Sequence, residues 1–494
     1  MTTPEFDLLI KNVRVVRPHG NVVHDSDIAI KDGQFALVAP GIDVARAKKV
    51  HDGQHRLAFP GVVDAHMHSG IYSPLIEDAV SESKAAAMGG VTSSLNYFRT
   101  GQYYLNKGGP YKKFYPEVLK TSKGRFHVDY GFHLAPMDGT HIKEIPELIE
   151  KFGVSSFKIF MFYGSHGLHG ASNSQREFLM IGEDERYDYA HFEFIMRGVQ
   201  AAREQFPERA RQISLSLHCE TAEVMTAYTK LVEKDKSFQK PGMGLAAYSA
   251  SRPQHSEGLA VFIASYLAHE TALPNINLLH LSSRKAVQAA MMMADVFPHI
   301  DFKREVTIGH LMLDINSKAA ELAKVNPPIR PREDVEFLWD ALLAGELDWV
   351  VSDHACCRHE MKIPKHYFGN IWMAKSGFGG TEYLLPALVS EGTRRGMGYN
   401  HMARVTSWNP AQRYGLNRKG DIAEGFDADL ALVDPAKTWT IAAKASPSTQ
   451  GYTPFEGLEL SARVEETFLR GHLIYQGGEV IGKPRGEYLH RPTA

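Results

Sequence analysis

The sequence LAFPGVVDAHMHS spans residues 57–69, and SESKAAAMGG follows at residues 81–90. The first segment is a short, mostly apolar run of the kind found in buried strands, whereas the second has the composition of a helix. A buried strand followed by a helix is the repeating unit of folds built on a parallel sheet. This pair therefore predicts that such a fold begins near residue 59.

The same order recurs through residues 59–415. Apolar runs and helix-like segments alternate there: SSFKIFMF, YDYAHFEFIMRGVQAAREQF, QISLSLHCE, TAEVMTAYTKLVEKD, NINLLHLSS, RKAVQAAMMMADVF, VEFLWDALLAGEL and DWVVSDHACC. About eight such units in roughly 350 residues fit a (β/α)8 barrel, an α/β fold of the TIM type. A doubly wound sheet is the alternative, but the Gly-x-Gly-x-x-Gly pattern of its dinucleotide-binding form is absent after the first strand.

The two ends of the chain differ from this middle part. Residues 1–58 contain FDLLIKNVRVVRP and DIAIKDGQFALVAP, and residues 416–494 contain DADLALVDPAKTWTI and ARVEETFLRGHLIYQGGEVIG. These are β-rich runs separated by Asn, Asp and Gly, which are typical of turns. We therefore expect both ends to form one small β-sandwich domain beside a barrel domain of residues 59–415.

The composition excludes several classes of protein. The 494 residues include 55 Lys and Arg against 57 Asp and Glu, and a net charge of −2 gives no reason to expect nucleic acid or a membrane as a partner. The first residues lack the pattern of a signal peptide, and no run approaches 18 apolar residues. Three Cys beside 24 His favour a cytoplasmic location, and metal ligands of imidazole and carboxylate rather than thiolate.

Several apolar runs end in residues of the types that can bind metals. His66 and His68 close the first run, and residues two apart on a strand point to the same face. His218, His280 and Asp353 each end a later run. In a barrel the carboxyl ends of the strands form the active-site face, so these five side chains are expected to converge. Taken singly, each has a structural alternative, such as a buried histidine or a helix-capping aspartate.

Lys158 lies inside the apolar run SSFKIFMF. A buried ammonium is costly. The structural explanations are therefore that the side chain reaches out to the strand end or forms an ion pair. The functional alternative is that burial lowers its pKa and leaves a nucleophilic amine. Such an amine could form a Schiff base, or could take up CO2 to give a carbamate that bridges two metals.

These residues together fit a two-metal site. Four histidines, one carboxylate and one modified lysine would satisfy two divalent ions and leave a position for water. In that arrangement a bridging hydroxide forms at neutral pH and attacks a carbonyl or phosphoryl centre, while Asp353 is placed to exchange protons with the substrate.

Longer segments resemble the hydantoinase/dihydropyrimidinase branch of the amidohydrolase superfamily, and the resemblance covers nearly the whole chain. It rests on PGVVDAHMH, SSFKIFMFY, LSLHCE, SRPQHSEGLAV, LLHLSS, NPPIRPREDVEFLWDALLAGELDWVVSDHACC, SWNPAQRYGL, GDIAEGFDADLALVDP and YTPFEGLELSARVEETFLRGHLIYQGGEVIGKPRGEYLHR. The last of these is the most specific to the branch. The resemblance implies a cyclic amidase with a binuclear centre, usually zinc, and a homo-oligomer, either a tetramer or a dimer.

The resemblance also implies a role for each residue. Lys158 would be N6-carboxylated and bridge the metals. Asp353 would be a ligand and would pass the proton of the attacking water to the leaving nitrogen. Tyr163 would donate a hydrogen bond to the developing oxyanion, although an aromatic plug in the barrel mouth is its structural alternative. The remaining ligands would be divided between the two ions, with His66 and His68 on the ion held by Asp353, and His218 and His280 on the other.

Three departures from the family pattern concern the substrate. The family places Ser and Asn at two positions that contact the cyclic amide through the backbone, whereas this chain has Asn326 in NPPIR and Ser376 in SGFGGTE, so the two residue types are exchanged. Recognition of the ring amide is expected to survive if backbone atoms make the contacts, and the substrate edge is expected to differ if side chains matter. The family stretch Glu-Thr-Cys-Pro-Gln-Tyr is here EVTIGHLMLD, at residues 305–314. Residues 164–188 form a longer segment than usual after the lysine strand, and we expect it to overhang the pocket.

Other functions remain as alternatives. Allantoinase or dihydroorotase chemistry would use the same metal site. Dihydroorotases usually carry Arg two residues after the second histidine, where this chain has Gly70, and that disfavours the latter. A non-enzymatic scaffold is the alternative of a different class, because dihydropyrimidinase-like neuronal proteins keep the fold but lack metal ligands. All six ligand positions are present here, which favours the enzyme.

Overall fold

The computed structural model describes residues 4–104, 106–164 and 174–493. Eight parallel strands form one sheet in which each strand pairs with its neighbour in the chain. They are β6 (Val62–Met67), β7 (Val91–Phe98), β8 (Asp129–Leu134), β9 (Ser156–Phe160), β10 (Ser214–His218), β11 (Asn275–Leu278), β12 (Asp301–Thr307) and β13 (Trp349–Val351).

This sheet closes on itself between its first and last strands. Met67, at the end of β6, pairs in parallel with His354, which follows β13. The amide of His68 donates to the carbonyl of His354 at 2.8 Å. Asp64, buried on β6, accepts a hydrogen bond from the amide of Ser352 at 3.1 Å. The predicted (β/α)8 barrel is therefore confirmed, and its closure holds the ends of β6 and β13 side by side.

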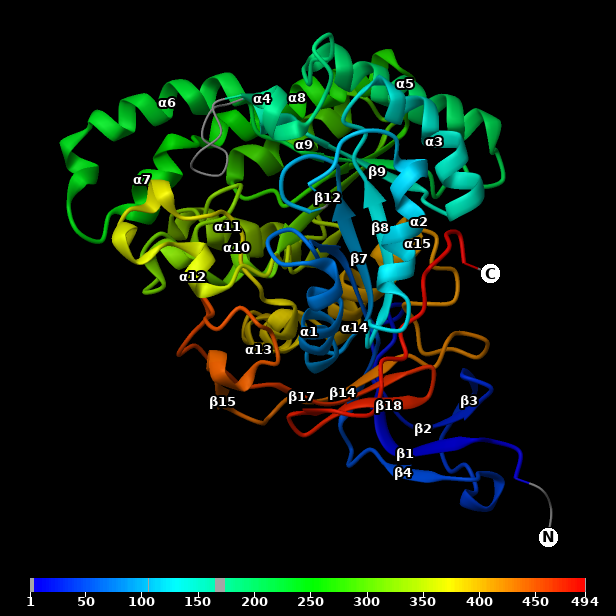
Figure 1. Cartoon of the computed structure of the whole chain (residues 1–494). Helices are drawn as coiled ribbons and strands as arrows, with labels where there is room; N and C mark the ends of the chain where they lie inside the picture. The colour runs from blue at the N-terminus through cyan, green and yellow to red at the C-terminus, as the bar shows by residue number, and fades with distance from the viewer. Residues whose placement is uncertain (1–3, 105, 165–173, 494) are drawn as a thin grey trace.

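Helices follow the strands and surround the barrel (Figure 1). Those between successive strands, or after the last, are α1 (Leu75–Met88), α2 (Tyr111–Ser122), α3 (Gly139–Phe152), α5 (Tyr189–Gln205), α8 (Gln254–Glu270), α9 (Arg284–Val296), α11 (Arg332–Leu343) and α13 (Leu384–Arg394). Others lie in the connections: α4 (Gln175–Leu179), α6 (Ala222–Lys234), α7 (Gly244–Ser251), α10 (Ile308–Met312), α12 (His359–Lys362), α14 (Tyr399–Ala403) and α15 (Asn409–Arg413). Among the described residues, none of the helices has both the length and the apolar character of a membrane span.

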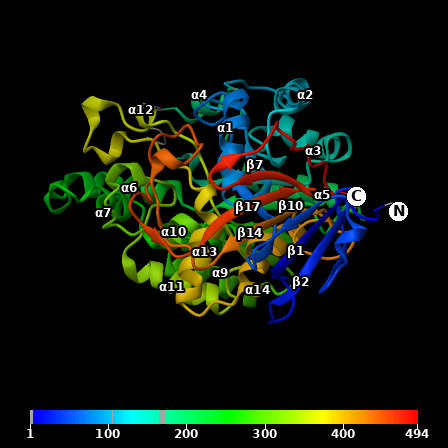
Figure 2. The same ribbon diagram turned by 90° about the horizontal axis from the view of Figure 1, so that it is seen from below.

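A second sheet contains strands from both ends of the chain and lies on one side of the barrel (Figures 1 and 2). Its strands are β1 (Leu8–Val15), β2 (His24–Lys31), β3 (Gln34–Ala39), β4 (Val50–Asp52), β5 (Leu57–Pro60), β14 (Leu430–Asp434), β17 (Arg463–Leu469), β18 (His472–Gln476) and β19 (Glu479–Val480). Antiparallel pairing of β5 with β14 joins the two ends, as the sequence predicts. A separate pair is formed by β15 (Trp439–Thr440) and β16 (Glu459–Leu460). The boundaries at residues 58 and 415 stay a prediction.

A buried ion cluster connects the barrel to this sheet. The Nζ atom of Lys419 lies 2.9 Å from Asp129 of β8, 3.1 Å from Asp427 and 2.7 Å from Asp429. Arg470, which follows β17, forms a further ion pair with Asp129. Burial opposes the charge on Lys419, but the three carboxylates outweigh burial and raise its pKa. Lys419 and Arg470 together therefore compensate most of the charge of three acids that have little contact with water.

We expect Lys419→Met to destabilise the fold by about 3–5 kcal/mol, because removing one partner leaves buried carboxylates without compensation. The measurement is the midpoint of thermal unfolding. Lys151→Met is the matched control, since Lys151 pairs with Glu147 on the surface with a 62% exposed side chain and should change the midpoint little. Equal shifts for the two variants would contradict the stabilising role of the cluster.

Candidate metal centre and substrate pocket

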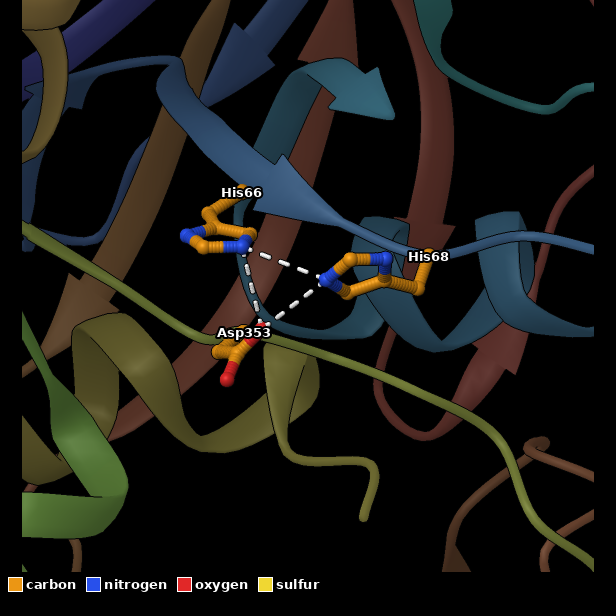
Figure 3. Close-up of side chains that lie close together, drawn as sticks. All are labelled: His66, His68 and Asp353. Carbon is orange, nitrogen blue, oxygen red and sulfur yellow. Dashed lines mark hydrogen bonds and ion pairs between the residues drawn. The ribbon is translucent and has the colours of Figure 1, made fainter. Parts of the chain in front are cut away.

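Three predicted ligands meet at the carboxyl end of the barrel (Figure 3). The Nε2 atoms of His66 and His68 lie 3.2 Å apart. The Oδ1 atom of Asp353 is 3.1 Å from the first and 3.2 Å from the second. All three residues are buried, and their donor atoms form a group able to hold a metal ion. The structure thus brings together the His-x-His pair and the late aspartate that the sequence separates by almost 300 residues.

The backbone turns sharply at two of the candidate positions. Asp353 has φ of 54° and His280 has φ of 35°, which is the left-handed region that L-residues rarely adopt. Each residue lies two positions beyond its strand, β13 and β11 respectively. The departure costs about 1–2 kcal/mol per residue, so surrounding contacts must hold both turns in place. Both turns lie at the carboxyl ends of barrel strands. Residues with such rare backbone conformations cluster at functional sites.

Neighbouring polar groups orient the two histidines of the first strand. Glu305 Oε1, on β12, lies 2.7 Å from Nδ1 of His66. The hydroxyl of Tyr104 bonds Nδ1 of His68. Burial is the largest influence on both imidazoles, and it lowers the pKa of each. Their Nε2 atoms therefore face Asp353 on neutral rings, which is the state of a histidine that binds a metal.

Lys158 lies in the middle of β9, and its amine reaches this group. The Nζ atom is 3.2 Å from Nε2 of His66 and 4.0 Å from the centre of the Tyr97 ring. The residue is 1% exposed, and burial lowers the pKa of its amine to about 7. Burial raises the pKa of the Asp353 carboxyl, but its hydrogen bond with His68 and the neighbouring polar groups outweigh burial, so the pKa falls below its usual value. The Lys158 amine therefore loses its proton far more readily than an exposed lysine does, and it lines the same pocket as a carboxylate that stays ionised.

His218 and His280 lie on the other side of Lys158 in the strand order. The ring of His280 is 4.3 Å from that of His218 and 5.3 Å from that of His66, measured between centroids. Glu220 Oε2 lies 2.7 Å from Nε2 of His218. The rings of these two histidines lie near this site, but the compact group of donor atoms found among the described residues there consists of His66, His68 and Asp353.

The donor set suits divalent cations. It offers imidazole nitrogens and a carboxylate oxygen, the ligand types that Zn²⁺ shares with other first-row metals. His280 supplies a further sign, because its buried Nδ1 has no hydrogen-bond partner among the described residues. A buried polar atom of this kind is costly unless it binds something, and a cation held here would satisfy it. The residues present therefore fit the metals that the sequence implies.

A pocket opens directly beside these donors. Eight of the nine predicted site residues line it, and only His66 lies behind: His68, Lys158, Tyr163, His218, His280, Asn326, Asp353 and Ser376. The exchanged residues touch each other there, since the Ser376 hydroxyl donates to Oδ1 of Asn326 at 3.2 Å. Tyr248 donates to the same oxygen, and Tyr72 donates to the Ser376 carbonyl at 2.6 Å. The two exchanged residues therefore form one hydrogen-bonded pair at the pocket.

Tyr163 approaches the pocket from the short 3-10 turn after β9. It is 4% exposed, and its hydroxyl oxygen accepts a hydrogen bond from Nε of Arg99 at 2.9 Å. Burial raises the pKa of the phenol, and the adjacent guanidinium partly opposes this. The hydroxyl therefore stays protonated near neutral pH and remains a hydrogen-bond donor.

Comparison with known proteins finds relatives of this chain along its whole length. The family model described as "Amidohydrolase family" matches residues 263–474. An allantoinase of Rubrobacter xylanophilus is 30% identical over 490 residues, covering 98% of this chain and 97% of its own. This chain belongs to the amidohydrolase family. A D-hydantoinase of Geobacillus stearothermophilus is 28% identical over 497 residues, covering 98% of the amidohydrolase described here and 96% of its own chain.

Solved structures show the same fold for this amidohydrolase. A crystal structure of D-hydantoinase superposes with a TM-score of 0.82 at 25% identity, covering 98% of both chains. Dihydropyrimidinase from Brevibacillus agri superposes with a TM-score of 0.81 at 23% identity, again over 98% of both chains. The predicted resemblance to the hydantoinase/dihydropyrimidinase branch is confirmed, and so is the prediction of an enzyme.

Four polar residues at the amidohydrolase site escaped sequence analysis. Glu305 and Glu220 contact the histidines, Tyr104 bonds His68, and Arg99 bonds Tyr163. A usable signal existed for two of them. Glu220 follows His218 by two residues, and Glu305 opens the stretch EVTIGHLMLD that departs from the family pattern.

The long segment after β9 is described only in part. Residues 165–173, where the sequence predicts a cover over the pocket, lie outside the described residues. Beyond them, the side-chain amide of Gln175 donates to the carbonyls of Tyr163 at 2.8 Å and Tyr187 at 3.0 Å. The described end of the segment is therefore attached to the residue that approaches the pocket.

Proposed function

We propose that this amidohydrolase opens a C–N bond of a cyclic amide, imide or ureide in a metal-dependent reaction. The observation that carries the proposal is the convergence of four histidines, Lys158 and Asp353 around one pocket lined by Tyr163. We further propose that the site binds two zinc ions. His66, His68 and Asp353 would hold one, and His218 and His280 would hold the other. The donor set supports this assignment.

Lys158 is proposed to bridge the two ions as a carbamate. Its neutral nitrogen attacks the carbon of CO2, an N–C bond forms while one C=O π bond opens onto its oxygen, and the nitrogen loses a proton to solvent. The product is an anion with two oxygens at the place of an amine. The buried position of Lys158 and its lowered pKa support this, because only the unprotonated amine has the lone pair.

The chain's own groups then have distinct tasks. Bound divalent cations would supply an acidified water and polarise the scissile carbonyl. Asp353 accepts a proton from the attacking water and delivers it to the leaving nitrogen. Tyr163 donates a hydrogen bond to the carbonyl oxygen as negative charge develops there. Glu305 and Tyr104 hold the histidines in the orientation that the site needs.

The ring of the substrate is proposed to lie against Asn326 and Ser376. Both line the pocket, and cyclic amides present one N–H donor and one C=O acceptor that a serine and an asparagine can satisfy. Two relatives support candidate substrates. The one named allantoinase supports a ureido-substituted ring, and the one named D-hydantoinase supports a simple hydantoin. Hydantoinase-like chemistry is the leading assignment, and allantoinase-like chemistry is the second.

A hydrolysis screen of the zinc-loaded enzyme, supplied with bicarbonate, tests the proposal. It should contain hydantoins, dihydrouracil, allantoin, dihydroorotate, cyclic imides and larger aryl lactams. We expect ring opening of at least one five- or six-membered cyclic amide. A protein that binds no divalent metal and opens none of these rings after metal and bicarbonate are added would support the non-enzymatic scaffold instead.

We expect Tyr163→Phe to lower kcat by about 10²–10³-fold, the usual effect of removing one donor to a developing oxyanion. The ring remains, so the pocket keeps its shape and the metal content should not change. The measurement is steady-state kinetics on the best substrate of the screen, with metal analysis of the same sample. Tyr187→Phe is a control, since that phenol contacts the backbone amide of Phe160 at 3.0 Å and does not line the pocket. An unchanged kcat would remove Tyr163 from the mechanism.

A homo-oligomer in the cytoplasm is proposed as well. Large apolar side chains are exposed on three adjoining helices: Leu259, Phe262 and Tyr266 on α8, Phe194 on α5, and Met292 and Val296 on α9. Exposed apolar side chains on neighbouring helices favour burial against a second copy. The three free, buried cysteines fit a reducing compartment.

Light scattering after size-exclusion chromatography tests the oligomer. We expect a dimer or tetramer for the natural sequence and a smaller species for Leu259→Glu with Tyr266→Glu, which places charges in the patch. Val50→Glu is the control. Val50 lies on β4 of the second sheet, away from these helices, and is 51% exposed. A monomeric natural protein, or an unchanged mass in the double variant, would contradict this interface.

A further inference from the structure

Arg99 is a buried cation directly after β7, at the carboxyl end of the barrel. It is 0% exposed, and its Nη1 donates to the carbonyls of Thr100 at 2.8 Å and Gln102 at 3.1 Å. No ion pair joins it to a carboxylate among the described residues, and its Nη2 is buried there without a hydrogen-bond partner. A fully buried charge without an acidic partner is expensive, so the site gains something from it.

Aromatic rings take the place of the missing carboxylate. The guanidinium carbon lies 5.0 Å from the ring centre of Tyr163, 5.3 Å from that of Tyr104 and 4.8 Å from that of Phe178. Cation–π contacts of this kind stabilise a desolvated guanidinium. Two of the three rings carry hydroxyls that line the pocket or bond a candidate ligand, so the charge lies just behind the reacting groups.

One hydrogen bond leads from Arg99 to the pocket. Its Nε–H donates to the hydroxyl oxygen of Tyr163 at 2.9 Å, so this oxygen is an acceptor and its own hydrogen must point elsewhere. Tyr163 lines the pocket, whereas Arg99 does not. The phenol donates to no acceptor among the described residues. Its hydrogen is thus available to a ligand in the pocket.

We propose that Arg99 is a positioning residue that aims the Tyr163 hydroxyl at the substrate carbonyl and strengthens it as a donor. This rests on the proposed oxyanion role of Tyr163. A charge-assisted hydrogen bond into the phenol oxygen draws electron density from its O–H bond, which becomes a stronger donor without losing its proton. The effect is greatest when the substrate oxygen becomes negative, so it should act on kcat more than on KM.

A double-mutant cycle tests the coupling. Arg99→Met keeps most of the side-chain volume and removes the charge and all donors. With Tyr163 present, we expect kcat to fall about tenfold with KM within about twofold and the metal content unchanged. In the Tyr163→Phe background, Arg99→Met should have almost no further effect on kcat, because the group through which it acts is gone. Additive losses in the two backgrounds, or an unchanged kcat with Tyr163 present, would overturn the proposal.

A conservative variant keeps the test decisive if Arg99→Met does not fold. Arg99→Lys retains a buried cation but loses the planar fork that donates to Tyr163 and the two backbone carbonyls together. We expect a kcat loss of about threefold with Tyr163 present and none in the Tyr163→Phe background. If Tyr163→Phe alone has no effect, the oxyanion role fails. If that variant is impaired but the two losses add, only the role of Arg99 fails.

Discussion

Replacing Lys158 with alanine is expected to remove the bound metal and to lower ring hydrolysis by more than about 10⁴-fold. The amine lies 3.2 Å from Nε2 of His66, beside the donor group, and no other residue of β9 has a side-chain nitrogen that could take its place. Without the bridging anion the histidines and Asp353 would have to hold two cations alone, and without the cations water is a poor nucleophile at neutral pH. Metal analysis and the rate on the best ring substrate measure the two effects.

Chemical rescue separates the bridging role from a merely structural one. A short carboxylic acid, such as acetate, fits the space that Lys158→Ala opens, and it offers two oxygens where the carbamate would be. We expect added acetate to restore part of both the metal content and the rate. Lys158→Gln is the matched control, because its side chain fills the same space and should prevent rescue. Full metal occupancy in the unrescued alanine variant would contradict a bridging lysine.

Much of this site could be predicted because it follows from strand ends. The runs around His66, His218 and His280 each stop at a polar residue, and a parallel barrel brings the carboxyl ends of its strands to one face. Periodicity and length alone indicated the barrel, and the β-rich ends indicated the sheet shared by both termini. These are local patterns with a fixed geometric consequence.

The residues that orient the ligands could not be predicted in the same way. Glu305 meets His66 across 239 positions of the chain, and Tyr104 meets His68 from a loop after β7. In the sequence, Arg99 looks like an ordinary charged residue after a strand. Its burial depends on the rings of Tyr163 and Phe178, which lie far from it in the sequence. No local period encodes such contacts. Only the closed barrel brings these residues within hydrogen-bond distance.

The exchange of Asn326 and Ser376 shows the same limit. Each departs from the family pattern when considered alone, and the sequence separates them by 50 positions. In the structure they share a hydrogen bond, so the two departures are one feature. A substrate ring in the pocket would therefore meet the two residues as a linked pair.

Asp353→Asn is expected to lower kcat by about 10³–10⁴-fold in an otherwise intact protein, near the upper end of what one general base contributes. The substitution keeps the size of the side chain. It also suits the backbone, since φ at this position is 54° and asparagine tolerates the left-handed region as aspartate does. The amide cannot accept the proton of the attacking water, so the loss is chemical. Asp348→Asn, at the opposite end of β13, is the control and should stay within about twofold.

Asp353 is also a proposed ligand, so the loss must be divided between binding and proton transfer. Its Oδ1 lies 3.1 Å from Nε2 of His66 and 3.2 Å from that of His68, where a shared cation would lie. We therefore expect a weaker affinity for zinc in Asp353→Asn, measured by titration, together with a rate that stays low when added zinc has restored full occupancy. A ligand without a proton-transfer role would regain the natural rate under those conditions. That recovery would leave the leaving nitrogen to take its proton from water, and the catalytic role of Asp353 would have to be abandoned.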